Sequence, residues 1–280
     1  MTNLVSTANL VSTEWLAAHL NEVRVVDASW YMPDEKREPA REFEAGHIPG
    51  AVFFDIDGIA DHSVNLPHML PTPGEFSKAV GALGIGDGET VVVYDGAGMF
   101  SAPRVWWSLK AMGHDNVKVL DGGFPKWKRE GRTVETGPAQ PTNKFFTAIP
   151  RSSLVRSFDD VMGIVKDKTA QMVDARSAAR FKAEEPEPRA GVRGGHMPGA
   201  LNVHYRKLIA DDGTLKTQDA LRAAFDAVDL DRPIVTTCGS GLTAAILMLA
   251  LDEIGARDMA LYDGSWTEWG GRPEAPVVKD

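Results

Sequence analysis

The chain has 280 residues, of which 43% are hydrophobic and 25% charged, a composition typical of a soluble globular protein large enough for two domains. The formal net charge of −9, without any basic run, argues against a nucleic-acid-binding surface. No stretch approaches the roughly 18 apolar residues of a membrane helix, and residues 1–6 lack the features of a targeting signal. A cytoplasmic protein without membrane contact is therefore expected. The single cysteine excludes an internal disulfide and a multi-cysteine zinc site.

Short apolar strands alternate with amphipathic helices through the first half of the chain. Ser12 and Thr13 are typical helix-capping residues at the start of this series. The alternation predicts an α/β fold in which a parallel sheet is flanked by helices on both faces. The expected strands are Val23–Ala28, Val52–Ile56, Thr90–Tyr94 and Val117–Leu120, and the expected helices are Trp15–Leu20, Glu75–Leu83, Pro103–Met112 and Pro125–Glu130.

The second half of the chain repeats the landmarks of the first in the same order, which indicates two domains of one fold. We expect an N-terminal domain over residues 1–140, a linker over 141–155 and a C-terminal domain over 156–280. The turn histidines His47 and His196 occur in both halves, which favours a structural role for them. The repeated blocks are Val26-Asp27-Ala28 with Val173-Asp174-Ala175, Gly46–Ala51 with Gly195–Ala200, and Asp121-Gly122 plus Trp127 with Asp263-Gly264 plus Trp269.

Cys238 stands between a predicted strand, Pro233–Thr237, and a predicted helix, Thr243–Leu251. Two glycines in the intervening turn, Gly239 and Gly241, allow the backbone to curl so that several N–H groups point at one atom. The helix dipole adds to this positive potential, so a sulfur placed here is biased toward the nucleophilic thiolate. A lone cysteine is more often a small buried apolar residue, but such a residue has no need of the flanking glycines.

The repeat aligns Asp95 of the first half with Cys238 of the second. A carboxylate cannot attack sulfur, so the N-terminal domain is expected to be non-catalytic. Cys238 is then the one residue of the chain able to carry sulfur chemistry.

Further blocks extend the pattern over nearly the whole chain, and with them the sequence resembles the two-domain rhodanese family. The loop from Cys238 to Thr243 resembles that of the family's 3-mercaptopyruvate sulfurtransferases, except that Leu242 replaces the usual valine. The blocks are Asp27–Trp30, Gly46–Ala51, Asp55–Asp57, His68–Pro71, Ser101–Trp107, Glu185–Arg189 and Asp263–Trp266.

The resemblance implies two tandem rhodanese-like domains and a sulfur transfer through a persulfide on Cys238. The donor would be 3-mercaptopyruvate, pyruvate would be released, and the acceptor of the sulfur would be cyanide or a thiol such as that of thioredoxin. The substrate carboxylate would be bound by Arg180 and Arg189, although the residues alone favour surface charges that balance nearby glutamates. The loop residues Gly239, Gly241, Leu242 and Thr243 would also bind the substrate. No metal or organic cofactor is implied.

The resemblance further implies a proton relay in which Asp57 and His68 support Ser240. The residues alone leave other roles open, because His68 before Met69 and Asp57 before Gly58 could each be ordinary turn residues. Thr243 could donate to the bound sulfur or cap the following helix.

Three alternative functions remain. Thiosulfate could be the preferred donor, although the enzymes that use it carry cationic residues after the cysteine, where Gly239 and Ser240 are neutral. The chain could be a rhodanese module used for binding or redox sensing, against which the intact cysteine loop argues. A related phosphatase or arsenate reductase would need an arginine six places beyond the cysteine, where Ala244 stands.

Overall fold

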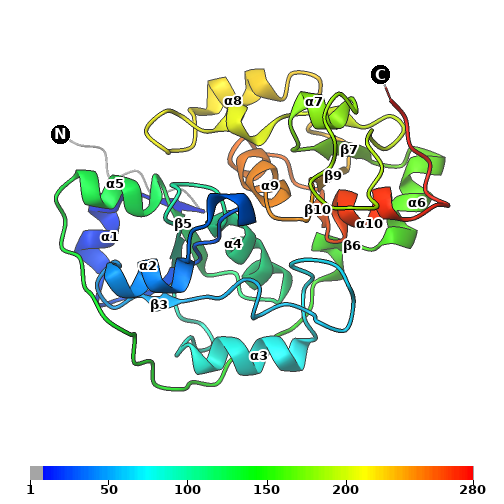
Figure 1. The fold of residues 1–280 in the computed structure, drawn as a ribbon. Helices are drawn as coiled ribbons and strands as arrows, with labels where there is room; N and C mark the ends of the chain where they lie inside the picture. The colour runs from blue at the N-terminus through cyan, green and yellow to red at the C-terminus, as the bar shows by residue number, and fades with distance from the viewer. Residues whose placement is uncertain (1–8, 280) are drawn as a thin grey trace. The chain divides into compact units, whose positions relative to one another are not determined.

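The structure is a computed structural model that describes residues 9–279 (Figure 1), so the expectation about residues 1–6 lies outside the described part. The chain forms two compact units. Among the described residues, unit 1 contains 9–60, 70–151 and 210–215, whereas unit 2 contains 61–69, 152–209 and 216–279. The domain boundaries expected from the sequence stay a prediction.

Unit 1 is built from five strands and five α-helices over its described residues. Its helices begin at clear sequence signals: the Ser12 hydroxyl accepts a hydrogen bond from the Trp15 N–H, and Thr72 and Glu75 form a capping box. The elements in chain order are β1 (Leu10–Val11), α1 (Thr13–His19), β2 (Arg24–Asp27), α2 (Pro39–Ala45), β3 (Val52–Phe53), α3 (Pro73–Ala82), β4 (Val91–Tyr94), α4 (Ala102–Ala111), β5 (Val117–Leu120) and α5 (Gly123–Arg129), with a 3₁₀ turn at Pro33–Glu35.

Unit 2 repeats this series. Ser157 and Asp160 form the capping box of its first α-helix. The elements are β6 (Val155–Arg156), α6 (Phe158–Asp167), β7 (Gln171–Asp174), α7 (Ala178–Phe181), β8 (Leu201–Asn202), α8 (Gln218–Ala224), β9 (Ile234–Thr237), α9 (Ala244–Glu253), β10 (Met259–Tyr262) and α10 (Ser265–Gly271), with 3₁₀ turns at Ser152–Leu154 and Tyr205–Leu208.

Both sheets are fully parallel and have the same topology. The strand order is β1-β5-β4-β2-β3 in unit 1 and β6-β10-β9-β7-β8 in unit 2. The registers correspond as well, since Asp27 pairs with Tyr94 and Asp174 pairs with Thr237. The structure therefore confirms two copies of one α/β fold, and each strand of one unit has a counterpart in the other.

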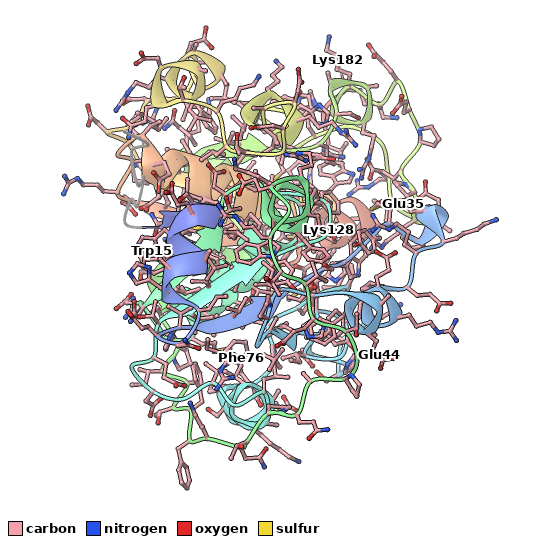
Figure 2. All side chains as sticks on the ribbon, turned by 90° about the vertical axis from the view of Figure 1, so that its left-hand side faces the viewer. Trp15, Glu35, Glu44, Phe76, Lys128 and Lys182 are labelled. Atoms are coloured by element: carbon pink, nitrogen blue, oxygen red, sulfur yellow. The ribbon has the colours of Figure 1, made fainter. Side chains whose placement is uncertain are left out.

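Each sheet is buried on both faces, which explains why the central strands are apolar without alternation. In unit 1, Val92 and Tyr94 pack with α1, α2 and α5, while α4 contacts the same strands from the other face. Figure 2 shows the strands between the helix that carries Trp15 and the helix that carries Phe76. In unit 2, Val235 and Tyr262 pack with α6 and α10, while α9 contacts β9 and β10.

The strands and helices expected in the first half are confirmed to within a few residues at most boundaries. The strand expected at Val52–Ile56 is shorter, because regular pairing with β2 ends at Phe53. Helix α2 and the edge strand β1 were not expected, since Pro39 and the charged residues of α2 leave a weak apolar pattern and β1 has only two residues. Residues 9–279 contain no helix with the length and apolar character that a membrane span requires.

Candidate active site

Cys238 lies at the carboxyl end of β9, the central strand of the unit 2 sheet. Loop 239–243 connects it to α9, which confirms the predicted strand-to-helix turn. Gly241 has a φ of 77°, a backbone conformation that is costly for a residue with a side chain, and it allows the tight turn. The cysteine is only 2% exposed, and its thiol is free. Carboxyl ends of central parallel strands are the usual place for ligand sites in such folds.

The backbone beside the cysteine is held by the first turn of α10. The Cys238 N–H donates to the Ser265 hydroxyl at 3.2 Å, and the Cys238 carbonyl accepts from the Trp266 N–H at 2.9 Å. The Gly239 carbonyl accepts from both the N–H and the hydroxyl of Thr267, at 2.9 and 2.6 Å. These bonds orient the start of the loop before any ligand arrives, which lowers the cost of ordering it.

The corresponding loop of unit 1 shows what such a turn can bind. Asp95 follows β4 as Cys238 follows β9. Its carboxylate accepts four backbone N–H bonds, from Ala97 at 2.9 Å, Phe100 at 2.8 Å, Ser101 at 2.9 Å and Ala102 at 2.8 Å. A turn at this position of the fold thus gathers amides around an anion, without any cationic side chain among these donors.

The same arrangement is expected around the sulfur of Cys238. The loop of unit 2 is one residue shorter, residues 239–243 against 96–101, but it likewise ends at the start of a long buried helix. In unit 1 the anion is a side chain of the loop itself, and an aspartate cannot form a persulfide. In unit 2 the same position is occupied by a thiol.

Arg180 lies against the cysteine loop. It belongs to α7, where the Ser177 hydroxyl caps the helix by accepting from the Arg180 N–H. A Cβ atom added to Gly239 would lie 3.1 Å from the Arg180 Nη2, so the guanidinium borders the residue next to the nucleophile. The side chain is 23% exposed, and its Nη2 donates to the Glu187 Oε2 at 2.5 Å. A cation that is fixed but still accessible is suited to binding an anionic substrate.

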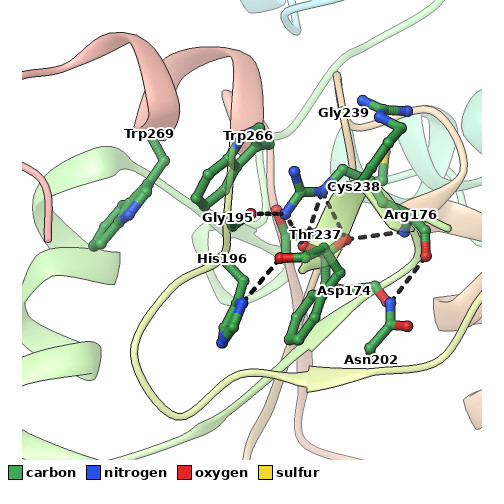
Figure 3. A network of polar contacts seen from close by, with 12 residues as sticks. Asp174, Arg176, Gly195, His196, Asn202, Thr237, Cys238, Gly239, Trp266 and Trp269 are labelled. Carbon is green, nitrogen blue, oxygen red and sulfur yellow. Dashed lines mark hydrogen bonds and ion pairs between the residues drawn. The ribbon is translucent and has the colours of Figure 1, made fainter. Parts of the chain in front are cut away.

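Arg180 is connected through Glu187 to a buried ion pair between Arg176 and Asp174, and Figure 3 shows this pair. Arg176 is 1% exposed and forms two hydrogen bonds through Nε and one through Nη2 with the Asp174 carboxylate, at 2.7 to 3.1 Å. Its Nη1 donates to the Glu187 Oε1 at 2.7 Å, and its guanidinium lies 4.1 Å from the Trp266 ring centroid. Burial lowers the pKa of Arg176, but the two carboxylates outweigh this effect and raise it. Glu187 therefore joins the buried Arg176 to the accessible Arg180.

Arg189 approaches the same loop through Thr267. Its Nη1 lies 3.5 Å from the Thr267 hydroxyl, which in turn bonds the Gly239 carbonyl. The segment from Ala183 to Arg189 contains no helix or strand, as its prolines predict. Arg180 thus borders Gly239 directly, whereas Arg189 reaches the same loop through Thr267.

The remaining candidate residues divide between the two units. Ser240 and Leu242 are buried in the loop, and Thr243 directly precedes α9 without a side-chain capping bond. His68 is 5% exposed and belongs to segment 61–69 of unit 2. Asp57 belongs to unit 1, where its carboxylate accepts from the Trp30 indole N–H at 2.8 Å. The proton relay stays a prediction.

The two repeated turn histidines have matching structural contacts. The His47 ring stacks on Phe43 and its Nδ1 lies 2.8 Å from the Phe43 carbonyl oxygen, while His196 stacks on Phe181 with its Nδ1 3.0 Å from that carbonyl oxygen. Within residues 9–279, no three His, Cys, Asp or Glu side chains gather in a way that could hold a metal ion.

A sequence profile of the rhodanese-like domain matches residues 12–130 and again residues 157–272. The chain belongs to the rhodanese family. Each of the two matched rhodanese segments spans the main strands and helices of one parallel sheet, from α1 to α5 and from α6 to α10.

Several rhodanese relatives match almost end to end. The 3-mercaptopyruvate sulfurtransferase of Escherichia coli strain K12 is 44% identical over 278 residues, which cover 98% of this chain and 99% of the relative. The thiosulfate sulfurtransferase of Rattus norvegicus is 41% identical over 281 residues, which cover 96% and 94%. A crystal structure from Escherichia coli, solved for the rhodanese fold and mechanism of 3-mercaptopyruvate sulfotransferases, superposes with a TM-score of 0.86 at 43% identity and covers 93% of this chain and 99% of that one. Overall identity alone does not separate the two sulfur donors.

Sequence reasoning missed the residues that support this rhodanese loop. Arg176 and Thr267 were given no role, and Glu187 and Ser265 appeared only within the blocks Glu185–Arg189 and Asp263–Trp266. Two signals pointed to them: Arg176 follows two residues after a repeated strand-end aspartate, and Ser265 follows directly after the repeated Asp263-Gly264 pair. Their partners are distant in sequence, so the contacts themselves could not be foreseen.

Proposed function

We propose that this rhodanese is a sulfurtransferase that takes its sulfur from 3-mercaptopyruvate. The Cys238 thiolate attacks the donor sulfur and forms an S–S bond, while the C–S bond breaks and its electron pair leaves with the carbon as the enolate of pyruvate. A proton delivered to this enolate completes pyruvate. An acceptor thiolate then attacks the outer sulfur of the persulfide and releases the Cys238 thiolate, so the reaction divides into two half-reactions.

One observation carries this proposal: the nucleophile stands in a turn whose unit 1 counterpart binds a carboxylate through four backbone amides. A persulfide anion, like that carboxylate, is stabilised by hydrogen bonds from backbone N–H groups. Amides fixed by the fold stabilise it without reorganisation, and they leave the nearby arginines available for the substrate.

Arg180 and Arg189 are suited to the donor's carboxylate. Replacing either by alanine is expected to raise KM for 3-mercaptopyruvate by about 5-fold to 150-fold, equal to about 1–3 kcal/mol of lost charge-assisted bonding, with a smaller change in kcat. Steady-state kinetics of pyruvate release measure both constants. Arg257→Ala is the matched control, because this exposed arginine precedes β10 and so lies at the opposite edge of the same sheet. Unchanged KM in both variants would exclude the two arginines as the carboxylate site.

The alternative donor is thiosulfate, and the composition of the loop favours 3-mercaptopyruvate. Gly239 and Ser240 add no charge beside the sulfur, and the Arg180 guanidinium lies where a side chain at position 239 would extend. We therefore expect a kcat/KM for 3-mercaptopyruvate at least about tenfold above that for thiosulfate, a difference of about 1.4 kcal/mol in transition-state binding. Both donors are compared with cyanide as the common acceptor. A higher value for thiosulfate would reverse the assignment.

The rhodanese relatives act as sulfurtransferases, so small-molecule donors and acceptors are the partners we propose for this chain. Thioredoxin as the thiol acceptor, the relay from Asp57 and His68 to Ser240, and a cytoplasmic location are finer proposals. The thioredoxin acceptor and the relay depend on the sequence resemblance, whereas the cytoplasmic location depends on the composition of the chain.

A further inference from the structure

Unit 1 contains a cavity of about 300 Å³ that the proposed sulfur transfer does not use. This volume lies at the lower end of the range for small-molecule pockets. The cavity lies among β2, α2 and α5, and its polar lining includes Asp27, Ser29 and Glu42. The aromatic ring of Phe124 forms part of the apolar wall.

Unit 2 shows what fills the corresponding place. There the guanidinium of Arg176 bonds the Asp174 carboxylate, donates to the Gly195 carbonyl at 2.8 Å and lies over the Trp266 ring (Figure 3). These three partners supply a carboxylate for the fork, a carbonyl for another N–H and an aromatic face for the planar cation, and Glu187 adds a second carboxylate.

The repeat places counterparts of Asp174, Gly195 and Trp266 in the wall of the unit 1 cavity. Asp27 ends β2 as Asp174 ends β7, Gly46 opens the same Gly-His turn as Gly195, and Phe124 follows Asp121 by three residues as Trp266 follows Asp263. All three counterparts line the cavity. The counterpart of Arg176 itself, two residues after the strand-end aspartate, is Ser29, which has no cation to offer.

The charges of the cavity support a ligand of mixed sign. Asp27 is 3% exposed; burial raises its pKa to about 6, although hydrogen bonds from Ser29 and Tyr94 oppose the shift, so it is mostly ionised at pH 7.5. Two cationic side chains, Arg37 and Lys128, also line the cavity. Arg37 is paired with Glu42, and the Lys128 ammonium lies 4.6 Å from the Phe124 ring centroid.

We propose that this cavity binds a small molecule that carries both a guanidinium group and a carboxylate, of which L-arginine is an example. The guanidinium takes the place that Arg176 occupies in unit 2, between Asp27 and the Phe124 ring. The carboxylate of the ligand faces the cations contributed by Arg37 and Lys128.

Isothermal titration calorimetry of the full chain at pH 7.5 tests the proposal with three probes. L-arginine is expected to bind with a dissociation constant below about 1 mM. L-citrulline has nearly the same shape but a neutral ureido group, and agmatine keeps the guanidinium but lacks the carboxylate. Both are expected to bind at least about tenfold more weakly, because each loses one charged contact.

Two variants locate the site. Ser29→Arg places a guanidinium beside Asp27, at the position that corresponds to Arg176, and is expected to abolish L-arginine binding. The control Ser153→Arg adds the same charge at an exposed position of unit 2 and is expected to leave L-arginine binding unchanged. Asp27→Asn is a second test if Ser29→Arg does not fold. It leaves Ser29 in place and changes the size of the side chain at position 27 very little. It is expected to weaken binding at least about tenfold.

Three outcomes would each overturn the proposal: no saturable binding of L-arginine, equal binding of L-citrulline, or undiminished binding by Asp27→Asn. If agmatine binds nearly as tightly as L-arginine, the proposed contact of the ligand carboxylate is wrong. The cavity would then be assigned to a guanidinium cation without a carboxylate. None of these measurements depends on Cys238, so failure here is distinct from failure of the proposed sulfur transfer.

Discussion

Replacement of Cys238 by serine is expected to abolish pyruvate release from 3-mercaptopyruvate while the protein stays folded. Serine is nearly isosteric with cysteine, so the buried turn and its bonds to Ser265 and Thr267 should persist. Its hydroxyl, however, cannot form a stable bond to sulfur, and no second thiol exists in the chain to replace it. Initial-rate measurements should show a loss greater than about 1,000-fold, equal to about 4 kcal/mol of transition-state stabilisation.

Intact-protein mass spectrometry provides a second measurement. The unmodified chain treated with donor in the absence of acceptor should gain the mass of one sulfur atom, and because it has a single cysteine, that gain assigns the site without peptide mapping. The serine variant should gain nothing, and its circular dichroism spectrum should match that of the parent. Turnover or sulfur uptake by the serine variant would disprove the persulfide mechanism.

Arg176→Met is expected to lower the free energy of unfolding by about 3–5 kcal/mol. Methionine fills much of the same space but leaves the Asp174 and Glu187 carboxylates, 2% and 3% exposed, without the cation between them. Urea denaturation followed by tryptophan fluorescence measures the change, since Trp266 and Trp269 lie in the same core.

Arg257→Met is the control for this experiment, because it removes an exposed arginine from the same unit and should change the free energy of unfolding by less than about 0.5 kcal/mol. Since Glu187 joins Arg176 to Arg180, the Arg176 variant should also show a raised KM for the donor. A loss of stability no greater than that of the control would show that the network is not a stabilising element.

The fold could be predicted from the sequence because its main determinants are local. Apolar strands such as Val91–Tyr94 must be buried on both faces, and capping signals such as Thr72 with Glu75 set the helix starts. The internal repeat then predicts two sheets, one in each half of the chain. Short elements escaped prediction: β1 has two residues and gains its stability from pairing with β5, which follows about 100 residues later.

The site could be predicted only in part, for a related reason. The cysteine turn is local, and Gly239 and Gly241 mark it in the sequence. The supporting contacts are not local, since Ser265 is 27 residues from Cys238 and Arg189 is 78 residues from Thr267. Arg176 was missed because burial of an arginine depends on two carboxylates reaching the same point, which no spacing in the sequence reveals.

The hydrogen bonds from α10 to the Cys238 and Gly239 carbonyls form late in biosynthesis. The nucleophile is translated before Ser265, Trp266 and Thr267, and until these emerge from the ribosome its loop lacks the bonds that shape it. At least 27 further residues must be added after Cys238 before its loop can take its final shape. The loop is therefore shaped in one of the last folding events, after most of the chain has been synthesised.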